Sequence, residues 1–186
     1  NMAATTDLGL CTATVSWTAP TVTDNCAGGV TVVTTHNPGA SFALGTTTVT
    51  YTATDASGNS ATCVFTVTVT DGEAPTIAGC PSNITVSTAP GLCTGTASWT
   101  APTATDNCPG VTFTTDHAPG SSFSLGTTTV TYTATDAAAH VTTCTFTVTV
   151  HDNENPAISC PANVTANTDA GLCTATVVVG SGTATD

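Results

Sequence analysis

The residues with the clearest chemistry in this chain are its nine cysteines. Most of them recur at a nearly constant interval, as Cys26 does at Cys108 and Cys63 at Cys144. The sequence has no Cys-x-x-Cys pair, and none of its four histidines stands at a metal-ligand spacing from a cysteine. We therefore expect a disulfide framework, which is typical of proteins in an oxidising compartment outside the cytosol.

One disulfide is expected between the first and last strands of a repeat. Cys80 begins the first of these segments and Cys144 begins the last, and both fall on the inward face by the alternation of apolar residues. Since first and last strands can run side by side in a sandwich of two sheets, we expect Cys80 and Cys144 to bond. A loop of this length should stabilise the fold by roughly 4 kcal/mol in the chain-entropy account.

Two further pairs are expected from short spacing. Cys93 and Cys108 flank a strand and the loop after it, and Cys11 and Cys26 stand at the same spacing one repeat earlier. We expect the bonds Cys93–Cys108 and Cys11–Cys26. We expect the partners of the remaining three cysteines to lie outside this chain: Cys63, Cys160 and Cys173.

Acidic and amide side chains near the expected repeat boundaries are the candidates for binding a cation. Calcium takes about six to eight oxygen ligands, and extracellular modules use carboxylates and amides for them. If the loops converge on the boundaries, six residues offer such oxygens: Asp55, Asn59, Asp71, Glu73, Asp152 and Glu154. The alternative is that Asp and Asn open turns by bonding their own backbone. Calcium is thus the one cofactor that the sequence leaves open.

Catalytic constellations are missing from the sequence. The four histidines share no spacing or partner, and we interpret them as surface-loop residues: His36, His117, His140 and His151. There is no Ser-His-Asp arrangement, no paired carboxylates and no phosphate-binding glycine loop. The sequence therefore predicts that the protein is not an enzyme.

The charge balance excludes two classes of partner. The chain has no Lys or Arg against 12 acidic residues, a formal net charge of −12. Nucleic-acid binding needs basic side chains on the phosphates, and anionic membrane surfaces attract basic segments. No apolar run approaches the ~20 residues that a membrane-spanning helix needs. We therefore expect no nucleic-acid partner and no membrane insertion.

Strands must position these residues. In residues 126–150 apolar residues fall on every second position, as Val130, Tyr132, Ala134 and then Phe146 and Val148 do, with Thr between them. A period of two indicates half-buried β-strands, and residues 45–69 repeat nearly the same stretch. Gly, Pro, Asn or Asp bound each short segment. The pattern predicts an all-β sandwich with no long helix.

The chain is a tandem repeat. We expect a repeat lacking its start at residues 1–74, a complete repeat at 75–155, and the first strands of a third at 156–186. We interpret the chain as a segment of a longer array. In the alternative interpretation, residues 156–186 would complete the first repeat of the next molecule. Residues 163–186 duplicate 1–24, which disfavours it.

A set of motifs in the second repeat resembles the hyalin repeat. They are Cys-Pro-x-Asn-Ile-Thr at 80–85, Trp99, Pro-x-x-x-Asp-Asn at 102–107, the Gly-Thr-Thr-rich run at 120–136, and Cys-x-Phe-x-Val-x-Val at 144–150. The resemblance covers essentially the whole chain. One departure is Asp-Ala-Ala-Ala-His at 136–140, where the family usually has Asp-x-x-Gly-Asn, as at 55–59.

The resemblance implies tandem immunoglobulin-like or fibronectin-III-like β-sandwiches of extracellular adhesion proteins. Thr-rich arrays of this kind are similar to giant surface adhesins of gliding Bacteroidota. We therefore expect a spacer or filament segment of a cell-surface adhesin, whose partners are neighbouring repeats or copies of itself in a fibre. The alternative is an adhesive module that binds a surface glycan or protein through its loops.

Overall fold

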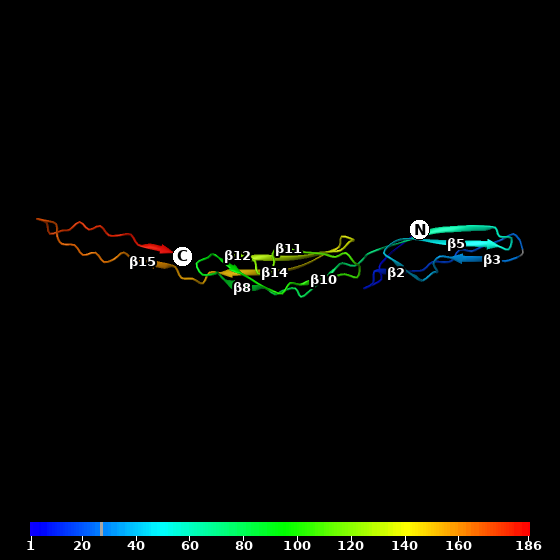
Figure 1. Cartoon of the computed structure of the whole chain (residues 1–186), viewed down its shortest axis with the longest axis horizontal. Coiled ribbons are helices and arrows are strands. Elements are labelled where there is room, and N and C mark those ends of the chain that lie inside the picture. Colours follow the sequence, from blue (N-terminus) through cyan, green and yellow to red (C-terminus); the bar gives the residue numbers. More distant parts are fainter. Residues whose placement is uncertain (27) are drawn as a thin grey trace. The chain divides into compact units, whose positions relative to one another are not determined.

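The computed structural model describes residues 1–26 and 28–186 (Figure 1). Among these residues there are sixteen strands and no α-helix, so the all-β fold class expected from the sequence is confirmed. The described residues accordingly include no helix that is long and apolar enough to cross a membrane.

The strands of residues 1–74 are β1 (Met2–Thr5), β2 (Thr12–Val15), β3 (Val30–Thr34), β4 (Ala40–Ala43), β5 (Gly45–Asp55) and β6 (Ser60–Thr70). Those of residues 75–155 are β7 (Thr76–Ala78), β8 (Ile84–Ser87), β9 (Thr94–Thr96), β10 (Thr103–Thr105), β11 (Thr112–Thr115), β12 (Ser122–Ser124), β13 (Gly126–Thr135) and β14 (Val141–His151). The last two are β15 (Ala157–Ser159) and β16 (Thr183–Thr185).

The chain packs into two compact units. The first contains Asn1–Pro81, Thr100–His117 and Val130–Thr145, and the second contains Ser82–Trp99, Ala118–Thr129 and Phe146–Asp186. This division follows packing, whereas the boundaries at 74 and 155 follow sequence repetition. Those boundaries stay a prediction.

Within the first unit, residues 1–74 form a sandwich of two sheets. One sheet has the order β1-β6-β5-β3 and the other pairs β2 with β4. Their facing side chains form one core: Ala13, Val15, Phe42, Val49, Tyr51, Val67 and Val69. Alternate residues of β5 and β6 supply most of it, because successive side chains of a strand point to opposite faces. Burying each large apolar side chain contributes about 1.5–3 kcal/mol.

Residues 75–155 repeat this arrangement, with the sheet β11-β13-β14-β8 and the pair β12-β9. The alternation in the sequence predicts the inward side chains correctly, since all seven are buried: Val130, Tyr132, Ala134, Cys144, Phe146, Val148 and Val150. Trp17 donates its indole N–H to the Tyr51 hydroxyl over 2.8 Å and packs edge-on against Phe65. Trp99 packs in the same way against Phe146.

The expected first strand of a repeat is divided in two. β7 pairs antiparallel with β10, whereas β8 pairs parallel with β14. Gly79, with φ of +75°, and Pro81 lie between them and end the first pairing. Cys80 therefore lies in the connection between two strands, not on the face of one.

Candidate functional site

Two disulfides organise the first compact unit. Cys80 bonds Cys144, the pair expected from strand position, with a sequence separation of 64. Cys11 bonds Cys108, with a sequence separation of 97. Closing loops this long removes much conformational freedom from the unfolded chain, which stabilises the folded state by roughly 4 kcal/mol per bond.

The expected pairs Cys11–Cys26 and Cys93–Cys108 are not the bonds of the structure. The loop before Cys11 lies at the end of β6, where the backbone N–H of Gly9 donates to the Glu73 carboxylate over 2.6 Å. Cys26 lies by the start of β6, where it lines a hollow with Asp55 and Asn59. The 11 residues of β6 span roughly 35 Å at about 3.3 Å per residue, which is far beyond the reach of a disulfide.

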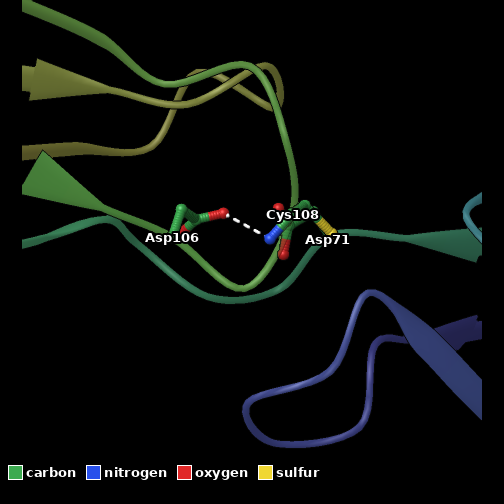
Figure 2. Close-up of side chains that lie close together, drawn as sticks. All are labelled: Asp71, Asp106 and Cys108. Atoms are coloured by element: carbon green, nitrogen blue, oxygen red, sulfur yellow. Dashed lines mark hydrogen bonds between the residues drawn. The ribbon is translucent and has the colours of Figure 1, made fainter.

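Cys108 reaches Cys11 because a turn holds it in place. The backbone N–H of Cys108 donates to the Asp106 carboxylate over 3.0 Å, which closes an Asx turn at residues 106–108 (Figure 2). The Asn107 side-chain amide donates to the carbonyl of Leu10 over 2.8 Å, one residue before Cys11. One turn of the second repeat is thus fastened to one loop of the first by a covalent bond and a hydrogen bond.

Asp71 joins the same boundary from the end of β6. One of its carboxylate oxygens accepts hydrogen bonds from the Thr6 hydroxyl over 3.3 Å and from the Glu73 backbone N–H over 3.2 Å. The Asn107 amide lies 3.5 Å from this oxygen. Asp71 thereby connects the loop before Cys11 with the turn that carries Cys108.

Several side-chain atoms that could serve as ligands lie close together at the boundary. One ligand atom each from Asp71, Asp106 and Cys108 lies within 4.8 Å of the others. The sulfur of Cys108 belongs to a disulfide and is not a thiolate, so it is no metal ligand of the usual kind. Asp106 Oδ1 and Asn107 Oδ1 are buried atoms without a hydrogen-bond partner among the described residues. The set therefore offers oxygens from Asp71, Asp106 and Asn107 to a cation or to water.

The loop at residues 136–140 belongs to this boundary as well. His140 Nδ1 lies 2.8 Å from Asp136 Oδ2, and the other oxygen of Asp136 accepts the backbone N–H of His140 over 2.8 Å. The hydrogen bond with Asp136 raises the pKa of His140, and the charges of Asp136 and Asp71 and a hydrogen bond to the Glu73 backbone add to this effect. Burial acts to raise the pKa of Asp136, yet the hydrogen bonds with His140 outweigh it and lower that pKa.

His140 takes the place that Asn59 has in the first repeat. The Asn59 side-chain amide donates to Asp55 Oδ2 over 2.8 Å, the same bond that the imidazole makes to Asp136. The departure at residues 136–140 therefore keeps the loop geometry and replaces an amide by a titratable ring. Interpreting His140 as a simple surface residue misses its partner, which lies four positions earlier in the chain.

The structure separates the six candidate cation ligands. Asp71 and Glu73 lie at the boundary just described, and Asp55 and Asn59 line the hollow with Cys26. Hydrogen bonding to Asn59 lowers the pKa of Asp55. In the second unit, Asp152 accepts the Glu154 backbone N–H over 2.9 Å, and Glu154 accepts that of Gly91 over 2.8 Å. Most of these carboxylates thus close turns by accepting backbone N–H groups. This agrees with the alternative interpretation, in which Asp and Asn open turns and do not bind calcium.

Sequence reasoning does not identify Asp106 and Asn107 as boundary residues. As an alternative to cation binding it gives Asp and Asn in general the role of opening turns, which Asp106 does, but the partner of Asn107 comes from a loop of the preceding repeat. Five cysteines have no disulfide among the described residues and are exposed: Cys26, Cys63, Cys93, Cys160 and Cys173.

Comparison with known proteins shows which domain family and which proteins the chain is similar to. The sequence model of the HYR domain matches residues 1–69 and 70–150. Hyalin from Strongylocentrotus purpuratus is 39% identical over 193 aligned positions, which cover 100% of this chain and 16% of that protein. Hyalin from Lytechinus variegatus is 41% identical, covering 97% of this chain and 35% of that protein. The chain therefore spans about a third or less of the length of these relatives.

A rat protein, sushi, von Willebrand factor type A, EGF and pentraxin domain-containing protein 1, is 37% identical over 71% of this chain and 4% of its own length. Among solved structures, extracellular cadherin domains 1–4 of protocadherin gamma B7 align over 81% of this chain and 46% of that chain, with 16% identity and a TM-score of 0.33. Human CDH23 EC21-23 aligns over 81% of this chain and 59% of that chain, with 17% identity and a TM-score of 0.32.

Proposed function

The chain belongs to the HYR domain family, and from this premise we propose that it is a structural spacer segment of an extracellular, cell-surface adhesion protein. It holds its repeats in line and carries no catalytic role. Its partners are neighbouring repeats of the same kind. The similarity to two hyalins over nearly the whole chain supports this proposal.

The observation that carries the proposal is the bond between Cys11 and Cys108. Two consecutive repeats joined by one peptide segment could swing about it, since domains of one chain move relative to each other unless their interface is large. A second covalent connection, with Asn107 on the Leu10 carbonyl beside it, removes most of that freedom. A spacer needs this restraint, whereas an enzyme or a simple linker does not.

The two repeats have cysteines at corresponding positions, so the same kind of disulfide can be placed at other repeat boundaries. Cys93 has the place of Cys11 in the second repeat, and Cys26 has the place of Cys108 in the first. Both are exposed and without a disulfide among the described residues. We propose that each such pair of positions bridges one boundary in a longer array, so that disulfides within repeats alternate with disulfides between them.

The absence of Lys and Arg suits a protein that works outside the cell. Trypsin-like proteases cleave after these residues, and the chain offers them no site. The expected likeness to surface adhesins of gliding bacteria stays a prediction, and the relatives named above come from animals.

Pulling the chain from both ends in a single-molecule force experiment tests the spacer role. While both disulfides are intact, the shortest covalent path from Cys11 to Cys144 runs through Cys108 and Cys80, so that only the segment between Cys80 and Cys108 bears load in this part of the chain. Reduction should release about 105 residues and add about 360 Å of contour length, at roughly 3.4 Å per residue. A gain of only about 220 Å, which the loop of Cys80–Cys144 alone would release, would refute the bridge between repeats. The Cys26→Ser variant is the matched control and should release the full length.

Calcium at the repeat boundary is a second proposal. The unpartnered oxygens of Asp106 and Asn107, beside the carboxylate of Asp71, favour a hard cation there. The three side chains supply fewer than the about six to eight oxygens of a complete site, so water or backbone would have to supply the rest. We expect calcium to raise the melting temperature of the wild-type chain and not that of the Asp106→Asn variant. Equal shifts in both would refute this site.

An adhesive module that binds a glycan or protein through the loops is the alternative function. It predicts that the isolated chain binds a glycan array or cell surfaces by itself. The spacer role predicts no such binding.

A further inference from the structure

The outer face of the sheet β1-β6-β5-β3 carries two exposed valines. Val33 of β3 is 64% exposed and Val64 of β6 is 58% exposed. Val64 precedes Phe65, which packs against the core, and Val33 pairs with Thr52, the residue after the core residue Tyr51. Because successive side chains of a strand point to opposite faces, both valines lie on the face that points away from the core.

The second repeat has threonine at both positions. Thr114 and Thr145 correspond to Val33 and Val64, and both are exposed. The outer face is therefore open to solvent in both repeats, and the exposure of the two valines does not depend on any further segment of the chain. Val141, also exposed, lies on the outer face of the second repeat at the start of β14. A single exposed valine is ordinary, whereas two valines from different strands on one face form an apolar patch.

The two valines lie on either side of β5, close to its middle. Val33 pairs with Thr52 of β5, and Thr50 of β5 pairs with Val64. Two strand spacings, about 10 Å, separate β3 from β6. Thr50 and Thr52 are half-buried and lie between the valines. We call these four residues, Val33, Thr50, Thr52 and Val64, the Val33–Val64 patch.

The face around the Val33–Val64 patch carries no charge. The outward residues of β1, β3, β5 and β6 are threonines, apart from the two valines, Ala3 and Ser60. The chain has a formal net charge of −12, so two copies repel each other. A neutral face lets a second copy approach with the least repulsion, whereas a basic partner finds no carboxylate on this face.

We propose that two copies of this chain associate through the outer faces of their β1-β6-β5-β3 sheets, with the Val33–Val64 patch at the centre. The contact is isologous, so the same face is used by both copies. β5 and β6 have 11 residues each, roughly 36 Å at about 3.3 Å per residue, and the four strands span about 14 Å. The contact therefore buries up to roughly 1,000 Å² in total, the lower limit of specific interfaces, and the dimer is weak and reversible.

This contact goes beyond the spacer role. The disulfides Cys11–Cys108 and Cys80–Cys144 connect parts of one chain, whereas the patch connects two chains. Burial of apolar surface drives the association, because four valines leave water when the two faces meet. Hydroxyl pairs within the sheet, such as Thr46 with Thr68 at 3.1 Å, satisfy part of the hydrogen bonding that the threonines lose with their water.

Sedimentation equilibrium of the intact, oxidised chain tests the proposal. The exposed thiols are first alkylated with iodoacetamide, so that no disulfide between chains can imitate the contact. We expect a monomer–dimer equilibrium in the micromolar range. The double variant Val33→Thr with Val64→Thr gives this face the residues of the second repeat and keeps β-branched side chains, so it should fold. Its dissociation constant should be higher by at least about tenfold, since four valines leave the contact.

A matched control and a change of salt separate this contact from others. Val141→Thr removes an exposed valine from the other repeat and should leave the dissociation constant unchanged. Higher salt should strengthen the dimer, because it screens the repulsion between two acidic chains. A chain that is monomeric at every concentration, or a double variant that dimerises as well as the wild type, would overturn the proposal. A dimer that salt weakens would also overturn it, since charges would then hold the contact. The force experiment probes bonds within one chain, so its outcome is independent of this one.

Discussion

The two repeats differ at one loop position, where the second repeat has a titratable histidine in place of an asparagine. His140 stands where the first repeat has Asn59, and it keeps the bond to the preceding aspartate. An amide makes that bond at any pH, whereas an imidazole makes it most strongly as a cation beside the Asp136 carboxylate. The second loop should therefore respond to pH where the first does not.

Stability should depend on the protonation of His140. Its pKa is raised on folding, so its contribution is fully present below the ordinary histidine pKa of 6.5 and is lost as pH rises through the raised value. The pKa of Asp136 is lowered, so its contribution is present above 3.8 and is lost as pH falls through the lowered value. The pair is strongest between these limits.

We expect the melting temperature of the wild-type chain to fall from about pH 5.5 to about pH 8.5 relative to that of the His140→Asn variant. Thermal unfolding followed by circular dichroism measures this difference, and the other three histidines cancel in the comparison. Parallel profiles for the two chains would contradict the ion pair.

Ala139 carries backbone strain in the same loop. Its φ is +70°, while Gly58, the counterpart in the first repeat, has φ of +90°. A side chain in this left-handed region costs roughly 1 kcal/mol, which glycine avoids. The Ala139→Gly variant should therefore be more stable by about 1 kcal/mol in denaturant unfolding. The reverse exchange, Gly58→Ala, is the matched test and should destabilise by a similar amount. A less stable Ala139→Gly variant or a more stable Gly58→Ala variant would contradict the assignment of strain.

At the scale of elements, alternation in the sequence predicts the sandwich well and the disulfides only in part. Val130 and Val148 are inward as expected, because a strand with one buried face must alternate. The pairing of Cys11 could not follow from spacing, because a short separation in sequence does not reveal that its neighbour Cys26 lies at the opposite end of β6. Only the arrangement of the strands settles which loops meet.

The turn at residues 106–108 acts as a connector between elements of two repeats. The side-chain amide of Asn107 donates to the Leu10 carbonyl, while the equivalent Asn25 donates its backbone N–H to Asp24 within its own turn. The Asn107→Ala variant should lose about 1 kcal/mol of stability, the usual net contribution of one hydrogen bond. Asn25→Ala, the matched control, should change stability by less than about 0.5 kcal/mol. Equal losses would show that the connection across the boundary contributes nothing.

At the scale of the whole molecule, two overlapping loops lock consecutive repeats together. The bond Cys11–Cys108 encloses Cys80, and the bond Cys80–Cys144 encloses Cys108, so neither loop can open without the other. The tandem organisation could be predicted from the repeat period, and the cysteine count indicates covalent support. The sequence does not reveal that one disulfide crosses a repeat boundary. Each repeat contains a second cysteine at short spacing that could pair within the repeat: Cys26 for Cys11, and Cys93 for Cys108.

Disulfide mapping of the oxidised chain tests this central claim most directly. Cleavage before aspartate separates the relevant cysteines: residues 7–23 carry Cys11, residues 24–54 carry Cys26, and residues 106–115 carry Cys108. Mass spectrometry without reduction should find residues 7–23 joined to 106–115, with Cys26 in neither. Residues 7–23 joined to 24–54 would place the bond inside one repeat and contradict a covalent bridge between repeats.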